Sequence, residues 1–231
     1  MSSTASASAR ALVTGSSSGI GEAIARRLLG DGWEVVGYDR APPTLEGPRF
    51  HAVTVELADA LALSKALAVE REVKALVHAA GFMRVAPLGK LDAQVGADLW
   101  CLHVQAAALL ADALAPGLRC GGRIVLIGSR TAAGAGERSQ YAATKAALVG
   151  MARSWAIELA PRGITVNVIA PAATDTPMLH DNARGAVPPR TPPIGRFVRP
   201  EEVAALTAFV LSEDAAAITG QQLVICGGSS L

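Results

Sequence analysis

The chain has 231 residues, of which 51% are hydrophobic and 18% are charged, and its 21 Lys and Arg nearly balance its 20 Asp and Glu. This length suits a single domain, because one doubly wound α/β sheet commonly runs to about 200–250 residues. The near-zero net charge leaves no basic surface for a phosphate backbone, so we expect no nucleic acid partner. Only 4% of the residues are aromatic, and such an apolar chain indicates strands of Val, Ile and Leu buried on both faces of a sheet.

The three cysteines indicate a reducing environment. They are odd in number and widely separated, which fits neither a disulfide framework nor a CxxC metal site: Cys101, Cys120 and Cys226. We therefore expect reduced thiols, a cytoplasmic protein and no bound metal.

Two segments share features with membrane or targeting sequences. The most apolar stretch, residues 99–118, contains His103, Gln105 and Asp112, so we expect a core helix and no membrane span. Residues 1–10 are rich in Ser and Ala, but an apolar strand follows at once and leaves no room for a secretory segment. We expect a disordered N-terminal tail over residues 1–10.

Short apolar runs that predict strands alternate with helical patterns along the chain. The strands are expected at residues 11–14, 34–38, 50–55, 75–78, 123–127, 165–169 and 223–225. The clearest helices are expected at residues 21–29, 99–114, 141–159 and 201–211. This alternation predicts parallel strands joined by right-handed crossovers. The fold class is therefore an open, doubly wound parallel α/β sheet of about seven strands, in one domain over residues 11–231.

Residues 171–200 interrupt this pattern. They contain seven of the thirteen prolines and show no strong periodicity. Loops of this length are usually functional, so we predict a substrate lid. A disordered linker is the alternative, but a complete helix and strand follow within the same domain.

A glycine-rich turn follows the first expected strand and opens the first expected helix: Thr14-Gly15-Ser16-Ser17-Ser18-Gly19-Ile20-Gly21. Gly15 would allow the tight turn, Gly19 the approach of backbone N–H groups to a pyrophosphate, and Gly21 close packing of helix on strand. The context of strand and helix makes this pattern a specific indication of dinucleotide binding.

The choice of cofactor depends on two adjacent residues at the end of the second expected strand. Asp39 lies 24 residues after Gly15, where a carboxylate can accept both hydroxyls of the adenosine ribose and repel a 2′-phosphate. This predicts NAD. Arg40 could instead bind the phosphate of NADP, but Ser16–Ser18 offer no second basic group.

Tyr141 and Lys145 lie four residues apart at the start of an expected helix, so their side chains share one face. An ammonium about 4 Å from a phenol contributes roughly 4 kcal/mol at an effective dielectric of about 20, which matches the cost of ionising a phenol of pKa about 10 at neutral pH. The pair is thus adequate as a general base, although Tyr-x3-Lys alone also fits an exposed helix pair. Ser129, twelve residues before Tyr141, follows the strand 123–127, where open α/β sheets bind ligands.

From Ala11 onward the sequence resembles the short-chain dehydrogenase/reductase family. It matches the family's Thr-Gly-x3-Gly-x-Gly turn and its Tyr-x3-Lys pair with an upstream Ser, with one residue fewer than usual between Ser129 and Tyr141. Residues 170–176 are similar to the family's Pro-Gly-x3-Thr element, with Ala172 in place of Gly. The resemblance implies a Rossmann-type fold and hydride transfer between NAD and a secondary alcohol or ketone, such as a sugar acid, a cyclic alcohol or a hydroxyacyl compound. With the apolar Leu109, Leu148 and Trp155 on long helices, it also predicts a homotetramer.

The resemblance assigns roles to individual residues. Tyr141 would take the substrate's hydroxyl proton, Lys145 would lower the pKa of Tyr141 and hold the nicotinamide ribose, and Ser129 would hydrogen-bond the substrate oxygen. The residues implied to contact the cofactor are Gly15, Ser17, Ser18, Gly19, Ile20, Gly21, Asp39, Arg40, Glu56, Leu57, Ala79, Ala80, Gly81, Tyr141, Lys145, Pro171, Ala172, Thr174 and Thr176.

Three positions depart from the family pattern. The family's Asn-Asn-Ala-Gly is His78-Ala79-Ala80-Gly81 here, and its Asp near the adenine is Glu56. His103 stands where the family has a catalytic Asn that holds a water molecule. We expect either that His103 replaces this relay and titrates in the working pH range, or that it is a buried structural imidazole.

The sequence does not identify the substrate. The residues that could line its pocket are Met83, Arg84, Arg130, Glu137 and Met178. Arg84 or Arg130 would then hold a substrate carboxylate, or both are ordinary surface charges. Two alternative functions remain: an NADPH-dependent 3-oxoacyl reductase, and a catalytically silent nucleotide sensor.

Overall fold

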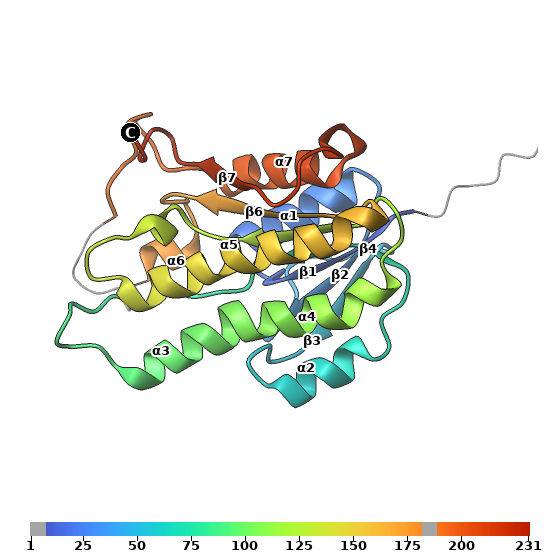
Figure 1. The fold of residues 1–231 in the computed structure, drawn as a ribbon, viewed down its shortest axis with the longest axis horizontal. Helices are drawn as coiled ribbons and strands as arrows, with labels where there is room; N and C mark the ends of the chain where they lie inside the picture. The colour runs from blue at the N-terminus through green and yellow to red at the C-terminus, as the bar shows by residue number, and fades with distance from the viewer. Residues whose placement is uncertain (1–7, 182–188) are drawn as a thin grey trace, which may run out of the picture.

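The protein folds around a parallel sheet of seven strands. The computed structural model describes residues 8–181 and 189–231. The strands lie in the order β3-β2-β1-β4-β5-β6-β7 (Figure 1). Their bounds are β1 Arg10–Thr14, β2 Glu34–Asp39, β3 Phe50–Thr54, β4 Val73–His78, β5 Arg123–Ile127, β6 Thr165–Pro171 and β7 Gln222–Ile225. The predicted doubly wound sheet is confirmed, and its strand order reverses between β1 and β4.

Helices cover both faces of this sheet. On one face, α1 (Gly19–Gly30) packs beside α7 (Pro200–Leu211). On the other lie α2 (Ala60–Leu67), α4 (Ala106–Leu114) and α5 (Ser139–Leu159) (Figure 1). Because both faces are covered, the side chains of the central strands are buried except for the half-buried Arg10 and Lys74, and the two sides alternate along each strand. In β1, Leu12 joins the cluster under α4 and α5, whereas Ala11 and Val13 join the cluster under α1.

The expected single helix over residues 99–114 is wrong in both its start and its continuity. Helix α3 begins at Ala93 and ends at Trp100, and a π turn over Cys101–Gln105 joins it to α4. Asp92 caps α3 by accepting the backbone N–H groups of Gln94 and Val95. The π turn has no sequence signal, because the apolar pattern runs through it without a break.

This long helical stretch is apolar enough to meet the length and composition of a membrane span. Within residues Ala93–Gly117, an 18-residue window has a mean hydropathy of 1.3, and 44% of that window is buried inside the protein. The buried side chains of α4 belong to the core cluster against the sheet: Ala106, Ala107, Leu110, Ala111 and Leu114. The stretch is therefore accounted for as a core helix.

Other differences from the prediction concern element ends. β1 begins at Arg10, so the expected tail is too long by that residue; residues 1–7 lie outside the described part of the chain. Helix α2 was not among the expected helices, although Asp59 is a regular N-cap that accepts the N–H groups of Leu61 and Ala62. Eight residues are too few for a convincing helical periodicity.

Residues 171–200 contain more regular structure than expected. β6 continues to Pro171, a short helix α6 spans Pro177–His180, and Thr174 forms an isolated bridge with Val198. Residues 182–188 lie outside the described part. The role of this segment as a substrate lid remains a prediction.

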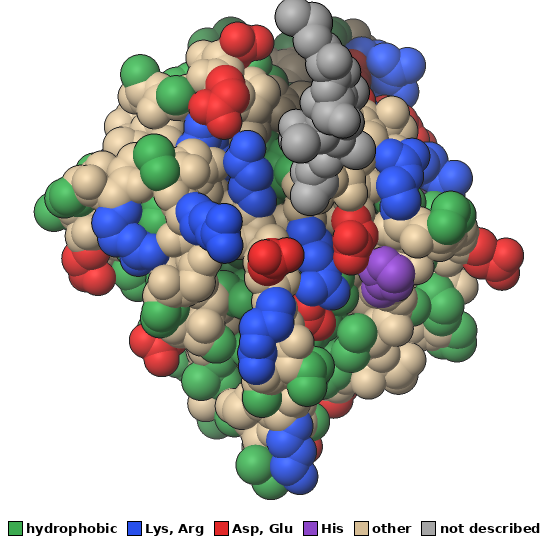
Figure 2. All heavy atoms as spheres, turned by 90° about the vertical axis from the view of Figure 1, so that its right-hand side faces the viewer, with side chains coloured by type: hydrophobic (Ala, Val, Ile, Leu, Met, Phe, Trp, Pro, Cys, Tyr) green, Lys and Arg blue, Asp and Glu red, His purple; other side chains and the backbone are tan. Residues whose placement is uncertain are grey.

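The edge at which the strands begin carries paired charges. Arg10 Nε lies 3.1 Å from Glu34 Oε1, and a terminal nitrogen of Arg10 lies 3.2 Å from Glu70 Oε2. Glu70 Oε1 also accepts the hydroxyl of Tyr38 at 3.0 Å. Figure 2 shows this side of the molecule, where acidic and basic side chains are interspersed. The Tyr38 hydroxyl reaches Glu70 from the other end of β2, where the backbone of Tyr38 pairs with Thr14.

Candidate active site

One large cavity of about 1390 Å³ lies at the opposite edge, where the strands end. Its walls come from the segments that follow β1, β2, β4, β5 and β6, together with α3 and the start of α5. Ligands of open parallel sheets bind at this edge, beside the point where the strand order reverses. The cavity exceeds the roughly 300–1,000 Å³ of a pocket for one small ligand, which leaves room for a dinucleotide and a substrate together.

The cavity gathers almost all of the residues predicted for the site. The exception is Ser17, which lies behind the wall, where its N–H donates to Asp39 Oδ2 at 3.0 Å. The predicted residues that do line it are Gly15, Ser18, Gly19, Ile20, Gly21, Asp39, Arg40, Glu56, Leu57, Ala79, Ala80, Gly81, His103, Ser129, Tyr141, Lys145, Pro171, Ala172, Thr174 and Thr176.

The turn between β1 and α1 is too crowded for side chains. Gly15 has φ +70°, and a Cβ there would lie 2.9 Å from Ala80 Cα. A Cβ on Gly21 would overlap the carbonyl oxygen of Gly15. Ser18, the N-cap of α1, makes no side-chain capping bond, so the N–H groups of the first turn remain available to an anion. The turn therefore fits the pyrophosphate of a dinucleotide.

The adenosine end of the cavity is marked by charged residues after β2 and β3. Asp39 is held in place because its two oxygens accept the N–H groups of Ser17 at 3.0 Å and Ala41 at 2.9 Å. A carboxylate has about four lone-pair sites, so both oxygens can still accept ribose hydroxyls. A terminal nitrogen of Arg40 lies 3.5 Å from Glu56 Oε2, and both side chains are exposed.

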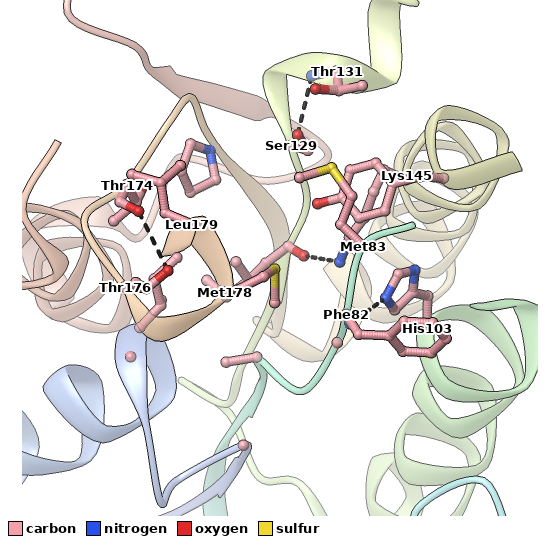
Figure 3. A pocket seen from close by; sticks show the side chains of 18 of the residues that line it. Phe82, Met83, His103, Ser129, Thr131, Lys145, Thr174, Thr176, Met178 and Leu179 are labelled. Carbon is pink, nitrogen blue, oxygen red and sulfur yellow. Dashed lines mark hydrogen bonds between the residues drawn. The ribbon is translucent and has the colours of Figure 1, made fainter. Parts of the chain in front are cut away.

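Lys145 is a buried cation without a carboxylate partner in the described part of the chain. Its Nζ donates to the carbonyl oxygen of Ile127 at 2.9 Å and lies 5.8 Å from the centre of the Tyr141 ring (Figure 3). Burial lowers the pKa of Lys145 to about 7. The ammonium is therefore poised between its two protonation states near neutral pH.

Ser129 and Tyr141 face the same cavity from two different elements. Ser129 ends the segment after β5, and its Oγ accepts the N–H of Thr131 at 3.1 Å (Figure 3). This leaves the Ser129 hydroxyl proton free to donate into the cavity. Tyr141 lies in the first turn of α5 and is 8% exposed. A donor hydroxyl and a phenol beside a buried ammonium can stabilise and protonate an oxyanion.

His103 is locked as a neutral imidazole. Its Nε2 accepts the N–H of Phe82 at 3.2 Å, so Nδ1 carries the proton and donates to Thr144 Oγ1 at 2.9 Å. The Thr144 hydroxyl in turn donates to the carbonyl oxygen of Tyr141 at 2.9 Å. Burial, assisted by Lys145 and His78, lowers the pKa of His103 well below its usual value. This direction favours the alternative of a structural imidazole, which also fits the contacts, and the role of His103 in a proton relay stays a prediction.

His78 forms a second locked network that sequence reasoning missed. Its Nε2–H donates to the carbonyl oxygen of Leu102 at 3.1 Å, and Nδ1 accepts the hydroxyl of Thr14 at 2.9 Å. Thr14 Oγ1 accepts the N–H groups of Ala79 and Ala80, both at 3.1 Å. Burial lowers the pKa of His78 to about 3. A signal existed, because Thr14 and His78 end two strands whose predicted crossover topology makes them neighbours.

Apolar side chains form two opposing walls in one part of the cavity. Figure 3 shows Phe82 and Met83, from the segment after β4, facing Met178 and Leu179 of α6 across the cavity. The five residues expected to line a substrate pocket all do so: Met83, Arg84, Arg130, Glu137 and Met178.

Comparison with known proteins identifies this arrangement. A family model described as "Enoyl-(Acyl carrier protein) reductase" matches residues 15–230. The chain belongs to the short-chain dehydrogenase/reductase family. It is 34% identical to the 3-oxoacyl-[acyl-carrier-protein] reductase FabG of Escherichia coli, over 94% of this chain and 96% of that protein. It is 32% identical to the D-threitol dehydrogenase of Mycolicibacterium smegmatis, over 96% of this chain and 92% of that protein.

Solved structures of family members agree with this assignment. A short chain dehydrogenase from Burkholderia cenocepacia in complex with NADP is 35% identical, with a TM-score of 0.86 over 96% of this chain and 98% of that one. A family protein from Francisella tularensis shares the fold at a TM-score of 0.90, with 24% identity and coverage of 97% and 99%. As a family member, the protein is an oxidoreductase that binds a nicotinamide cofactor. The crowded glycine turn, the anchored Asp39 and the buried Lys145 fit such a cofactor.

Proposed function

We propose that the protein interconverts a secondary alcohol and a ketone of a small substrate, with NAD as its cofactor. The proposal is carried by one observation: Ser129, Tyr141 and the buried Lys145 share a cavity with a phosphate-binding turn. A nucleotide sensor would need the turn but not these three side chains. Both the 3-oxoacyl reductase and the D-threitol dehydrogenase among its relatives are oxidoreductases by name.

Each of the three side chains has a separate role in the reaction. The bound nicotinamide supplies or accepts the hydride. Tyr141 exchanges the proton of the substrate oxygen at its own hydroxyl, and Ser129 donates a hydrogen bond to the same oxygen as charge develops there. The ammonium of Lys145 favours the phenolate form of Tyr141 and is placed to bind ribose hydroxyls.

The preference for NAD rests on charges at the adenosine end. Two carboxylates, Asp39 and Glu56, face one guanidinium, and Arg40 is already within 3.5 Å of Glu56. A 2′-phosphate would have to approach Asp39 and compete with Glu56 for Arg40, whereas ribose hydroxyls can donate to Asp39. The competing choice is NADP, which the B. cenocepacia relative holds in its structure.

Steady-state kinetics with both cofactors test this choice. A carboxylate bonded to two ribose hydroxyls contributes about 1.5–3 kcal/mol, so we expect wild type to prefer NAD at least tenfold in kcat/KM. In Asp39→Ser, we expect NADP efficiency to rise while NAD efficiency falls, because Arg40 is then free to pair with the phosphate. Thermal unfolding serves as a control, since Asp39 also anchors the N–H groups of Ser17 and Ala41. An unchanged NAD/NADP ratio would refute the assignment.

We also propose that the protein assembles as a homotetramer. Of the side chains first considered for this role, Leu148 is fully buried in the core, and Leu109 and Trp155 pack partly against it. Better support comes from large apolar side chains that are exposed on α7, on α5 and on the edge strand β7: Phe209, Ile157 and Val224. Light scattering would contradict the proposal if it found a stable monomer at micromolar concentration.

A further inference from the structure

Two arginines at the cavity differ from the other arginines of the protein. Among the described residues, five arginines are buried or half-buried. Three have a carboxylate nearby: Arg10 with Glu34 at 3.1 Å, Arg84 with Asp181 at 3.6 Å and Arg123 with Glu213 at 3.5 Å. For the side chains of the other two, no hydrogen bond or ion pair to the described part of the chain is found: Arg130 and Arg138.

These two arginines flank the reacting groups. Arg130 directly follows Ser129, and Arg138 is the N-cap of α5, three residues before Tyr141. Both line the cavity. The Nε atom of Arg138 is buried and has no partner among the described residues. The Nε atoms of Arg10 and Arg123 are buried in the same way, so what distinguishes Arg138 is that it lines the cavity and has no carboxylate within 4.0 Å among the described residues.

The surroundings favour an anion at this place. Helix α5 has 21 residues, no acidic residue in its first turn and no side-chain cap at its N-terminus, so its dipole adds to the two guanidinium charges. Four acidic residues also line the cavity: Asp39 and Glu56 at its adenosine end, and Asp98 and Glu137 elsewhere. Asp98 already accepts the side-chain amide of Gln94 at 2.8 Å, and Glu137 is exposed. Neither carboxylate lies within 4.0 Å of Arg130 or Arg138.

We propose that the substrate carries a carboxylate, which Arg130 and Arg138 bind while its carbonyl group lies between Ser129 and Tyr141. The planar guanidinium donates two parallel hydrogen bonds to a carboxylate, which gives both affinity and orientation. The substrate is thus an oxo acid or the matching hydroxy acid, in contrast to a neutral acyl ester. This inference rests on the proposed function and specifies its substrate class.

The test compares acids with their neutral esters. Acetoacetate, levulinate and 5-oxohexanoate place the carboxylate at increasing distance from the ketone, and each is assayed beside its methyl ester with NADH or NADPH. We expect at least one acid to exceed its ester tenfold in kcat/KM. In Arg130→Gln and Arg138→Gln this acid-to-ester ratio should fall at least tenfold, mainly through KM for the acid. Arg153→Gln is the matched control, because Arg153 is exposed on α5 and lies outside the cavity lining.

Binding is measured separately from turnover. Calorimetry of the cofactor-bound protein should detect the preferred acid but not its ester, and this binding should weaken in Arg138→Gln. Esters that match or exceed all three acids in wild type, or absence of acid binding to the cofactor complex, would overturn the inference. Failure of the proposed function looks different, since the protein would then turn over neither the acids nor the esters, whether or not it binds NADH or NADPH in a fluorescence titration.

Discussion

The chain has two tyrosines, and they lie in opposite electrostatic surroundings. Tyr38 is fully buried and donates its hydroxyl to Glu70, so burial and the neighbouring carboxylate raise the pKa of Tyr38 far above its usual value. Tyr141 is almost as buried, but the nitrogen of Lys145 lies 5.8 Å from the centre of its ring. The same side chain is thus held as a permanent donor in one region and placed for proton transfer in the other.

The comparison extends to the two edges of the sheet. At the edge where the strands begin, Arg10 is within 3.2 Å of both Glu34 and Glu70. At the edge where they end, Lys145 lacks a carboxylate partner among the described residues, and so do the half-buried Arg130 and Arg138, which line the cavity. At the first edge, charged side chains pair with each other within the chain and so stabilise the fold. Charges left without partners indicate where a ligand completes the structure.

The largest expected effect comes from removing the hydroxyl of Tyr141. Tyr141→Phe keeps the ring and its packing but removes the proton carrier, so we expect kcat to fall by about 10²–10⁴ with NADH binding retained. Steady-state kinetics and a fluorescence titration measure the two effects. Retention of more than a tenth of the wild-type rate would contradict the role of Tyr141.

Lys145 should make stability depend on pH. The unfolded chain holds this proton up to about pH 10, whereas the folded protein releases it at about pH 7. The unfolded state therefore binds more protons between these values, and the free energy of unfolding should rise with pH there, by up to about 1.4 kcal/mol per unit. Below pH 7 both states are protonated, so this group adds no further slope.

Urea unfolding at pH 7, 8 and 9 measures this slope. We expect Lys145→Met to lose it, while Lys65→Met, a change at an exposed lysine of α2, keeps it. The same slope in wild type and Lys145→Met would show that the burial of Lys145 has no such consequence.

A smaller effect is expected where Gly81 meets His103. A Cβ on Gly81 would lie 2.8 Å from His103 Nε2, so Gly81→Ala should destabilise the protein by about 1–3 kcal/mol through overpacking. His103→Ala removes the obstacle, so the double variant should lose less stability than the sum of the two single variants, with a coupling of at least about 0.5 kcal/mol. If urea unfolding instead gave additive losses of unfolding free energy, there would be no steric clash between a side chain at position 81 and His103.

The smallest effect is expected from Tyr38→Phe. Losing one hydrogen bond to Glu70 should cost about 1 kcal/mol of stability, and kcat should stay within twofold of wild type. Together with Tyr141→Phe, this variant separates the two regions, since one change affects stability and the other affects turnover. A tenfold drop in kcat for Tyr38→Phe would mean that the two edges of the sheet are coupled.

The sequence carried enough information for the sheet and for residues that act through local motifs. Alternation of apolar runs predicted the strands, and the spacing of Gly15, Ser129 and Tyr141 placed them at one edge. The partners of His103 could not be predicted, because Phe82 and Thr144 approach it from distant parts of the chain. Arg138 was not singled out for the same reason: which arginines lack a partner depends on the packing of the whole fold.

The π turn between α3 and α4 contains one residue more than a regular α-helical turn. It therefore changes which face α3 presents relative to α4. Each residue of a helix advances the face by about 100°, so the extra residue lets α4 keep its apolar face on the sheet while Val95 and Asp98 of α3 face the cavity. A deletion of one residue within Cys101–Gln105 would leave the cover of the sheet intact and turn this wall away from the substrate. Changes of length at this position therefore offer a route by which substrate preference can vary while the core stays the same.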